Sequence, residues 1–263
     1  MAKKKLTIKK VKQLLNETPV DKQLLTQLQD DKRAGVQQAL RTYYHRQERE
    51  QARREAFQQR LVIERSYWEK GVQYVAGIDE VGRGPLAGPV VAAAVILPHD
   101  FALYDVNDSK QLSATKREAL YQQILTEAVA VAVGWADNRL IDEVNIYQAT
   151  ITAMEQAVAD LTVRPDQLLI DAMTIASDVP QQKLIKGDAK SASIAAASIV
   201  AKVNRDHLMA FYDEIYPGYE FGHNAGYGTK AHLQGLANYG VSPIHRRTFE
   251  PIKTGLVTGK YSG

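Results

Sequence analysis

The chain of 263 residues contains no cysteine. This absence excludes a disulfide framework, a thiolate nucleophile, an iron–sulfur cluster and a cysteine-liganded zinc site. Long apolar runs are missing too: the longest uncharged stretch, Gly84–His99, is interrupted by prolines and is shorter than the about 18 apolar residues of a membrane-spanning helix. No apolar signal-peptide core follows the basic start Met1–Lys5. The sequence therefore predicts a soluble, cytoplasmic protein without a membrane partner.

Several familiar catalytic signatures are also absent. The six histidines are scattered and show no HExxH spacing, so none is interpreted as a zinc ligand. The chain has no Walker A sequence, no Rossmann GxGxxG and no GxSxG elbow. These absences argue against an NTPase, a dehydrogenase and a serine hydrolase.

Glycine and proline are scarce at the start of the chain, where only Gly35 and Pro19 precede residue 71. Residues 1–70 hold 9 Lys and 8 Arg against 9 acidic residues, a balance of +8, whereas residues 71–263 have a balance of −5. A basic arm on an acidic body is typical of proteins that act on polyanions. The alternative interpretation is a solvated helical surface that happens to be rich in Lys and Arg.

The arm is predicted to be helical, and the body to be a mixed sheet. Apolar spacing predicts helices over 6–15 and 24–28 and from about 32 to 70, ending at Gly71. The domain boundary is accordingly placed between an extension, 1–71, and a body, 72–263. Strands are expected at 74–78, 90–97, 129–135, 167–171 and 183–186, and helices at 146–161, 192–208 and 230–239. The Gly-rich link 81–89 is too short for a crossover helix, so the first two strands should form an antiparallel hairpin. The fold class is α/β, a mixed sheet flanked by helices.

Four acids stand at the ends of apolar strands: Asp79, Glu80, Asp171 and Asp188. A carboxylate at the edge of a core is costly unless it is paired or bound to metal. Several such acids at one sheet edge form an oxygen-rich site that suits Mg²⁺ or Mn²⁺, and two such ions promote phosphodiester hydrolysis. Asp79 and Glu80 can share one site only if the strand bends there. The alternative is that each acid is an N-cap, a turn former or an ion-pair partner.

Two further segments suit a nucleic-acid substrate. The tripeptide Gly82-Arg83-Gly84 could let the backbone approach a sugar or phosphate, with Arg83 as a charge partner. The segment 107–110 could cap a helix and supply Lys110 to a phosphate. The alternatives are an ordinary glycine turn and a plain N-cap followed by a surface lysine.

Taken together, the motifs resemble those of ribonuclease HII, the type 2 ribonuclease H family, in its bacterial members. They occur in family order over about residues 72–252. The segments that carry the resemblance are Gly77–Pro89, Asn107–Lys110, Leu169–Asp171, Lys186–Asp188, Ser193–Asp206, Gly226–Thr229 and His245–Phe249. The opening segment, Gly-Ile-Asp-Glu-Val-Gly-Arg-Gly-Pro-Leu-Ala-Gly-Pro, is highly specific.

The resemblance implies an RNase H-like fold and hydrolysis of the RNA strand of RNA–DNA hybrids. It also implies incision 5′ of a single ribonucleotide in duplex DNA, with two Mg²⁺ or Mn²⁺ ions and with 3′-hydroxyl and 5′-phosphate products. A monomer is expected. The competing hypothesis is a non-catalytic hybrid-binding protein on the same fold, which would lack one or more of the metal acids.

By the same resemblance, the family's functional residues correspond to positions of this chain. The four metal-binding acids correspond to Asp79, Glu80, Asp171 and Asp188, the motif that senses the 2′-hydroxyl to Gly82, Arg83 and Gly84, and the tyrosine that packs on the neighbouring deoxyribose to Tyr227. Ala172 and Gly228 depart from the Gly and Pro of many relatives, but neither change touches a carboxylate.

Overall fold

The computed structural model describes residues 6–17 and 19–263. The chain falls into two compact units, of which the first ends at Ala56 and the second is Phe57–Gly263. The first unit holds α1 (Ile8–Leu14), α2 (Lys22–Gln29) and most of α3 (Ala34–Arg60). These helices bury a small apolar core of their own around Val11, Leu28 and Leu40. The helical character expected of the arm is confirmed.

The second unit begins earlier than the predicted boundary at residues 71 and 72. Phe57 and Leu61 are fully buried in its hydrophobic core. Tyr67 on α4 (Val62–Trp68) packs against a further cluster and donates to Gln182 Oε1 at 2.9 Å. The segment 57–71 therefore belongs, by packing, to the same unit as the sheet.

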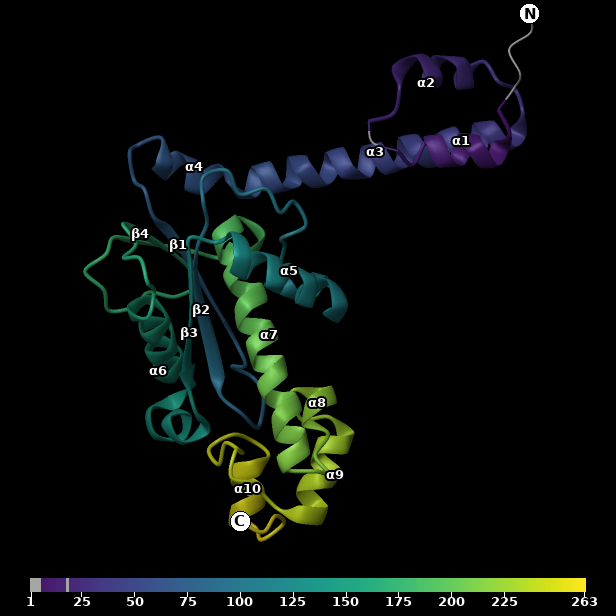
Figure 1. Cartoon of the computed structure of the whole chain (residues 1–263). Helices are drawn as coiled ribbons and strands as arrows, with labels where there is room; N and C mark the ends of the chain where they lie inside the picture. Colours follow the sequence, from purple (N-terminus) through teal and green to yellow (C-terminus); the bar gives the residue numbers. More distant parts are fainter. Residues whose placement is uncertain (1–5, 18) are drawn as a thin grey trace, which may run out of the picture. The chain divides into compact units, whose positions relative to one another are not determined.

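Five strands form one mixed sheet, as predicted (Figure 1). The strands are β1 (Val75–Val81), β2 (Val90–Ile96), β3 (Ala130–Ala136), β4 (Gln167–Asp171) and β5 (Gln181–Leu184). Their order is β3-β2-β1-β4-β5, with β1–β2 and β2–β3 antiparallel and β1–β4 and β4–β5 parallel. The predicted hairpin of β1 and β2 is confirmed.

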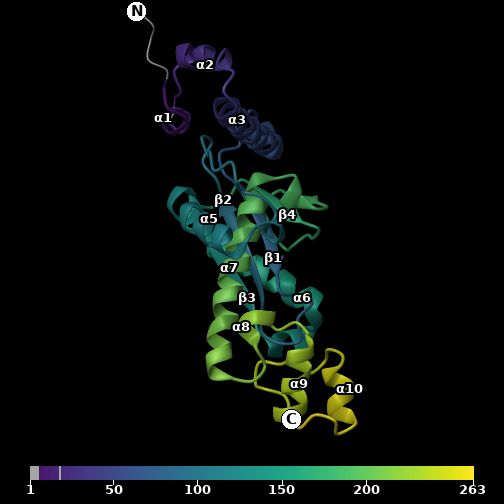
Figure 2. The ribbon, with the colours of Figure 1, turned by 90° about the vertical axis from the view of Figure 1, so that its right-hand side faces the viewer.

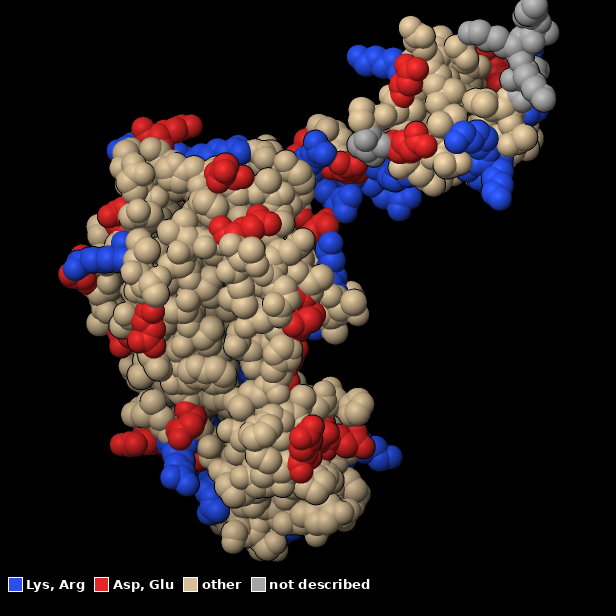
Figure 3. Space-filling view, in the orientation of Figure 1, with Lys and Arg blue, Asp and Glu red and all other residues tan. Residues whose placement is uncertain are grey.

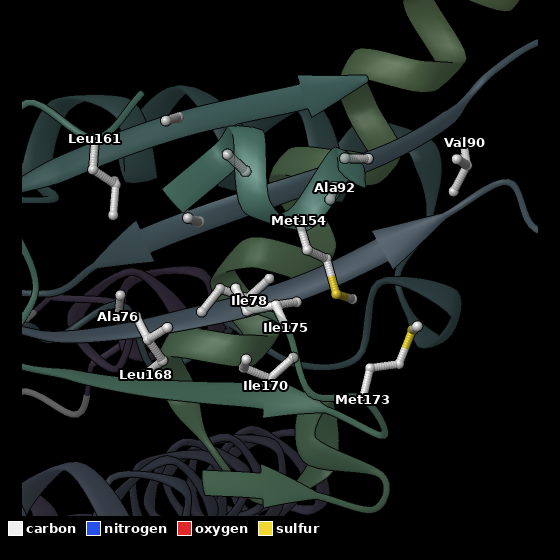
Figure 4. Close-up of a cluster of buried hydrophobic side chains, with 14 of the residues drawn as sticks. Ala76, Ile78, Val90, Ala92, Met154, Leu161, Leu168, Ile170, Met173 and Ile175 are labelled. Atoms are coloured by element: carbon white, nitrogen blue, oxygen red, sulfur yellow. The ribbon is translucent and has the colours of Figure 1, made fainter. Parts of the chain in front are cut away.

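Helices cover both faces of this sheet (Figures 1 and 2). The helices that follow β2 along the chain are α5 (Ala114–Glu127), α6 (Asn138–Ala159), α7 (Ala192–Ile215), α8 (Phe221–Asn224), α9 (Lys230–Tyr239) and α10 (Ile252–Val257), with short 3-10 turns η1 (Ser109–Gln111) and η2 (Gly187–Ala189). One face packs under α6, where Ile78, Met154 and Ile170 meet in an apolar cluster (Figure 4). The opposite face packs against the alanine-rich start of α7, whose small side chains allow helix and sheet to approach closely.

Several elements differ from their predicted bounds. The segment 107–110 caps only the 3-10 turn η1, through Asp108, and helix α5 has its own N-cap, Ser113. No bounds were predicted for α5, because its long side chains are mostly exposed and only Leu120 and Ile124 are buried. Helix α6 starts before the predicted residue 146, with a break at Asn145, whose φ is 73°. Helix α7 runs on to Ile215, and β5 lies two residues earlier than expected, since Ile185 points to solvent and is 58% exposed.

The C-terminal helices pack around the Gly-rich link between β1 and β2. Leu86 and Ala87 of this link share a buried cluster with Phe221 of α8 and Leu236 of α9. The Leu86 N–H donates to the Gly226 carbonyl at 2.8 Å, and this backbone hydrogen bond helps to hold the link in place. No helix among the described residues is both long enough and apolar enough to cross a lipid bilayer.

Candidate active site

Strand β1 carries two adjacent acids, Asp79 and Glu80. Both lie inside the strand, so the prediction that they close it is wrong: pairing with β2 continues to Val81. Asp79 is only 6% exposed. The Glu80 N–H donates to Asp79 Oδ1 at 2.8 Å, which turns the first carboxylate along the strand toward the second residue.

The other two acids come from segments far along the chain. Asp171 is the last residue of β4, as predicted, and the parallel register of β1 and β4 places it beside Asp79. Asp188 lies in the turn η2 and does not follow a strand directly, because β5 ends at Leu184. The Gly187 N–H donates to Asp171 Oδ1 at 2.7 Å, and this bond joins the segments of the third and fourth acids.

The first three acids share one electrostatic environment. Burial raises the pKa of Asp79 well above its ordinary value, and the charges of Glu80 and Asp171 raise it further, against an opposing hydrogen bond with the Ser198 hydroxyl. Burial also raises the pKa of Glu80; Arg83 opposes this shift and Asp171 adds to it. Each carboxylate is thus partly buried and lies near other negative charges. A bound cation would offset both the repulsion and the cost of desolvation.

The fourth acid belongs to the same field. Burial raises the pKa of Asp188, and the charges of Asp108 and Asp171 raise it further. Lys110 lowers it, so this exposed lysine lies close enough to act on the carboxylate. Asp171 is therefore the acid that interacts with each of the other three.

The donor set fits a hard divalent cation. Glu80 Oε2 is buried and has no hydrogen-bond partner among the described residues, an expensive state for an acid oxygen that a metal ion would end. Across residues 6–17 and 19–263, no group of three or more His, Asp or Glu side chains is already gathered as a metal-binding cluster. The four acids are thus close enough to interact electrostatically without already forming a set of metal ligands.

The loop Gly82–Gly84 is held from below by a buried arginine. Arg246 donates to the carbonyls of Gly82 at 2.5 Å and Arg83 at 2.9 Å. Burial lowers the pKa of Arg246 to about 9, which leaves it charged at neutral pH. Gly82 has a φ of 91°, and a Cβ there would lie 2.2 Å from Arg205 Nε, so the position requires glycine. The outer residue Arg83 reaches Glu80 Oε1 at 3.3 Å.

Tyr227 lies beside this loop and is 50% exposed. Its ring carbon Cε1 is 3.4 Å from where a Cβ on Gly84 would stand. Two buried histidines hold its backbone. His232 Nδ1 donates to the Tyr227 carbonyl at 2.9 Å, and His232 Nε2 lies 2.9 Å from His245 Nε2. His245 Nδ1 in turn accepts from the Ser242 N–H. Burial lowers the pKa of His245 to about 3, so it is neutral at neutral pH.

Residues that the sequence analysis did not single out support this site. Ser198 acts on Asp79 and lies 2.9 Å from the Ser109 hydroxyl. Arg205, only 1% exposed, donates to the carbonyls of Pro89 and Ala225. For Ser198 the available signal was a polar side chain inside the apolar start of α7, which usually has a specific buried partner, whereas the polar neighbours of Arg205 give no such signal.

Comparisons with known proteins agree with this arrangement. The family model for ribonuclease HII matches residues 76–252, and the model for the ribonuclease HII N-terminal domain matches residues 7–68. The ribonuclease HII of Ligilactobacillus salivarius is 61% identical over 249 residues, covering 95% of this chain and 97% of that protein.

Solved structures share the fold. The ribonuclease H2 of Pyrococcus horikoshii OT3 is 26% identical with a TM-score of 0.61, covering 69% of this chain and 96% of that one. Bst-RNase HIII in complex with Mn²⁺ is 19% identical with a TM-score of 0.51, covering 72% and 71%, a likeness of fold alone. The sheet flanked by helices is thus an RNase H-like fold. Family and fold support endoribonuclease activity on RNA–DNA hybrids. The chain belongs to the ribonuclease HII family and is a metal-dependent endoribonuclease, a hydrolase.

Proposed function

We propose that this protein hydrolyses the RNA strand of RNA–DNA hybrids and incises duplex DNA 5′ of a single embedded ribonucleotide. Its cofactors are two Mg²⁺ or Mn²⁺ ions, bound together with substrate. The observation that carries the proposal is a buried oxygen of Glu80, which lies among like-charged acids and has no hydrogen-bond partner within residues 6–17 and 19–263. A non-catalytic hybrid-binding protein would have no use for that costly arrangement.

The ions would be held by Asp79, Glu80, Asp171 and Asp188, and when bound they supply an acidified water and charge neutralisation at the leaving oxygen. In the reaction, a water oxygen bonds to phosphorus and the P–O3′ bond breaks. The products are a 3′-hydroxyl, after proton uptake by the leaving oxygen, and a 5′-phosphate. The four acids would serve as metal ligands. They would do so in their ionised form, because a deprotonated carboxylate is the form that binds metal.

The neighbouring loops would select the substrate. Gly82, Arg83 and Gly84 contact the sugar that bears the 2′-hydroxyl, with their carbonyls fixed by Arg246. The exposed ring of Tyr227 packs against the next deoxyribose, where no 2′-hydroxyl has to be desolvated. Lys110 binds a phosphate near Asp188.

We expect the enzyme to act as a monomer, because the four proposed metal ligands lie in one chain. We expect it to act in the cytoplasm, where its proposed substrate, chromosomal DNA, is found. The decisive test uses end-labelled duplexes with one ribonucleotide, with an RNA–DNA hybrid or with DNA alone, each with Mg²⁺, Mn²⁺ or EDTA. We expect metal-dependent cleavage of the first two only, 5′ of the ribonucleotide in the first. Binding to both without cleavage in either metal would favour the non-catalytic alternative.

A further inference from the structure

A buried acid other than the four proposed metal ligands lies in the segment that was predicted to belong to the extension. Glu64 on α4 is fully buried. Its Oε1 accepts hydrogen bonds from the hydroxyl of Ser191 at 2.6 Å, the hydroxyl of Ser193 at 2.7 Å and the Ser193 N–H at 2.9 Å. Its Oε2 has no partner among the described residues. One carboxylate oxygen thus gathers the donors at the first turn of α7.

The junction that Glu64 holds also carries Asp188. Ser191 is the N-cap of α7, and its N–H donates to the Gly187 carbonyl at 2.8 Å. Asp188 lies within this closed turn, and the Gly187 N–H donates to Asp171 Oδ1. A shift of the N-cap would therefore move the backbone that bears one acid and supports another.

The start of α7 also bears on the acids of β1. A Cβ at Gly77 would lie 2.1 Å from the Ser193 carbonyl carbon, so helix and strand meet backbone to backbone two residues before Asp79. Ser198, which acts on Asp79, follows on the same helix. The position of α7 along its own axis, relative to β1, consequently determines whether Ser198 contacts Asp79.

Glu64 is suited to fix this axial position of α7. The first N–H groups of a helix have no partner within the helix, and its N-terminus favours negative charge. Glu64 satisfies the Ser193 N–H and brings a carboxylate to the start of a 24-residue helix. Without it, the two serine hydroxyls and this N–H would be buried with fewer acceptors.

We propose that Glu64 is a positioning residue of the active site: through Ser191 and Ser193 it fixes the junction of η2 and α7, and with it Asp188, Asp171 and Asp79. This inference rests on the proposed metal site. Such supporting hydrogen bonds around metal ligands typically change metal affinity about 10- to 100-fold when removed.

The test uses the full chain and four variants: Glu64→Gln, Glu64→Ala, Leu61→Ala and Asp171→Asn. Leu61 is the matched control, since it lies one turn away, is 1% exposed and packs in the apolar core, whereas the hydrogen bonds to the serines come from Glu64. Mn²⁺ binding is measured by electron paramagnetic resonance, melting temperature without metal by calorimetry, and kcat and KM on the single-ribonucleotide duplex.

We expect Glu64→Gln to weaken Mn²⁺ binding about ten-fold and to lower kcat with KM nearly unchanged. Glu64→Ala should weaken binding more; should it fail to fold, Ser193→Ala takes its place with the same expected direction. Leu61→Ala should lower the melting temperature while Mn²⁺ binding stays within about two-fold.

Wild-type Mn²⁺ affinity in Glu64→Gln, or an equal loss of affinity in Leu61→Ala, would overturn the positioning role. Failure of the proposed metal site itself would give a different result. In that case the wild-type protein and Asp171→Asn would bind Mn²⁺ equally weakly. The two failures are therefore distinguishable, because only the first leaves Asp171→Asn with a measurable effect.

Discussion

Asp171 has the largest expected effect of any single residue, because it interacts with each of the other three acids. Asp171→Asn keeps an oxygen that can accept from the Gly187 N–H but replaces a carboxylate ligand by a weak amide. We expect cleavage to fall by about 100-fold or more in saturating Mg²⁺. Without metal, the variant should melt at or above the wild-type temperature, because like-charge repulsion is relieved. Near-wild-type turnover would refute the ligand role.

Tyr227 offers a test of substrate selection. Tyr227→Phe keeps the ring beside Gly84 and loses only the hydroxyl, whereas Tyr227→Ala loses the ring. We expect Ala to cost roughly ten-fold more than Phe on a single embedded ribonucleotide. Both should melt like the wild type, since the side chain is half exposed. Equal impairment of the two variants would contradict the packing role, and unfolding of Tyr227→Ala would identify a structural tyrosine.

The raised pKa values of Asp79, Glu80 and Asp188 predict how metal and pH act together. In the metal-free protein the folded state holds protons that the unfolded chain releases, so the free energy of unfolding falls as pH rises from the ordinary carboxyl pKa toward the raised values. A divalent ion binds the ionised form. The melting-temperature difference between Mn²⁺ and EDTA should therefore be larger at about pH 8 than at about pH 5.5. A difference that does not change with pH would contradict the assignment.

At the scale of elements, two glycines separate stability from activity. A Cβ at Gly77 would strike α7, and a Cβ at Gly134 would lie 2.0 Å from the Ala153 carbonyl of α6 on the other face. Either Gly→Ala change should cost roughly 3 kcal/mol by overpacking. Only Gly77→Ala displaces the helix that follows Asp188, so cleavage per folded molecule should fall in Gly77→Ala and persist in Gly134→Ala. Chemical denaturation paired with active-site titration measures both; equal specific activities would refute the distinction.

Elements with a strong local pattern were predictable from sequence. The uninterrupted apolar β2 and the strand ending at Asp171 needed only their own residues. The start of α6 was missed because the left-handed Asn145 interrupts the helix, a conformation that tertiary contacts select. The four acids could be picked out from the sequence. The position of Asp171 beside Asp79, however, depends on the register of β1 and β4, which the sequence alone does not show. The buried contact between Glu64 and Ser193 joins residues 129 positions apart, which no local pattern encodes.

At the scale of the whole molecule, the charge is divided between the two units. Lys and Arg side chains gather on the N-terminal unit (Figure 3), where Lys9, Lys10, Lys12, Arg41 and Arg46 are exposed. A chain that begins at Phe57 should bind duplex more weakly and with a smaller dependence on salt, because fewer counterions are released from phosphate. Its kcat should stay close to that of the full chain. An unchanged affinity and salt slope would leave this unit as a structural or partner-binding element.

A chain that begins at residue 72 provides the matched comparison. It also lacks Phe57, Leu61 and Glu64, which pack within the second unit. We expect a further loss of several kcal/mol of stability, since each large buried apolar side chain contributes about 2–5 kcal/mol. Equal melting temperatures for the two shortened chains would show that the segment 57–71 contributes nothing to the core.

The parallel pairing of β1 with β4 also has a consequence during synthesis of the chain. The two strands are separated along the sequence by two strands, two α-helices and one 3-10 turn, and Asp188 follows later still. Closing so distant a pair is slow compared with forming the β1–β2 hairpin, whose contacts are more local. A growing chain on the ribosome can therefore complete the β1–β2 hairpin well before it holds all four acids proposed to bind metal. Any fragment that stops short of residue 188 lacks Asp188, one of the four acids proposed to bind metal, so we expect hydrolytic activity only from chains that extend beyond it.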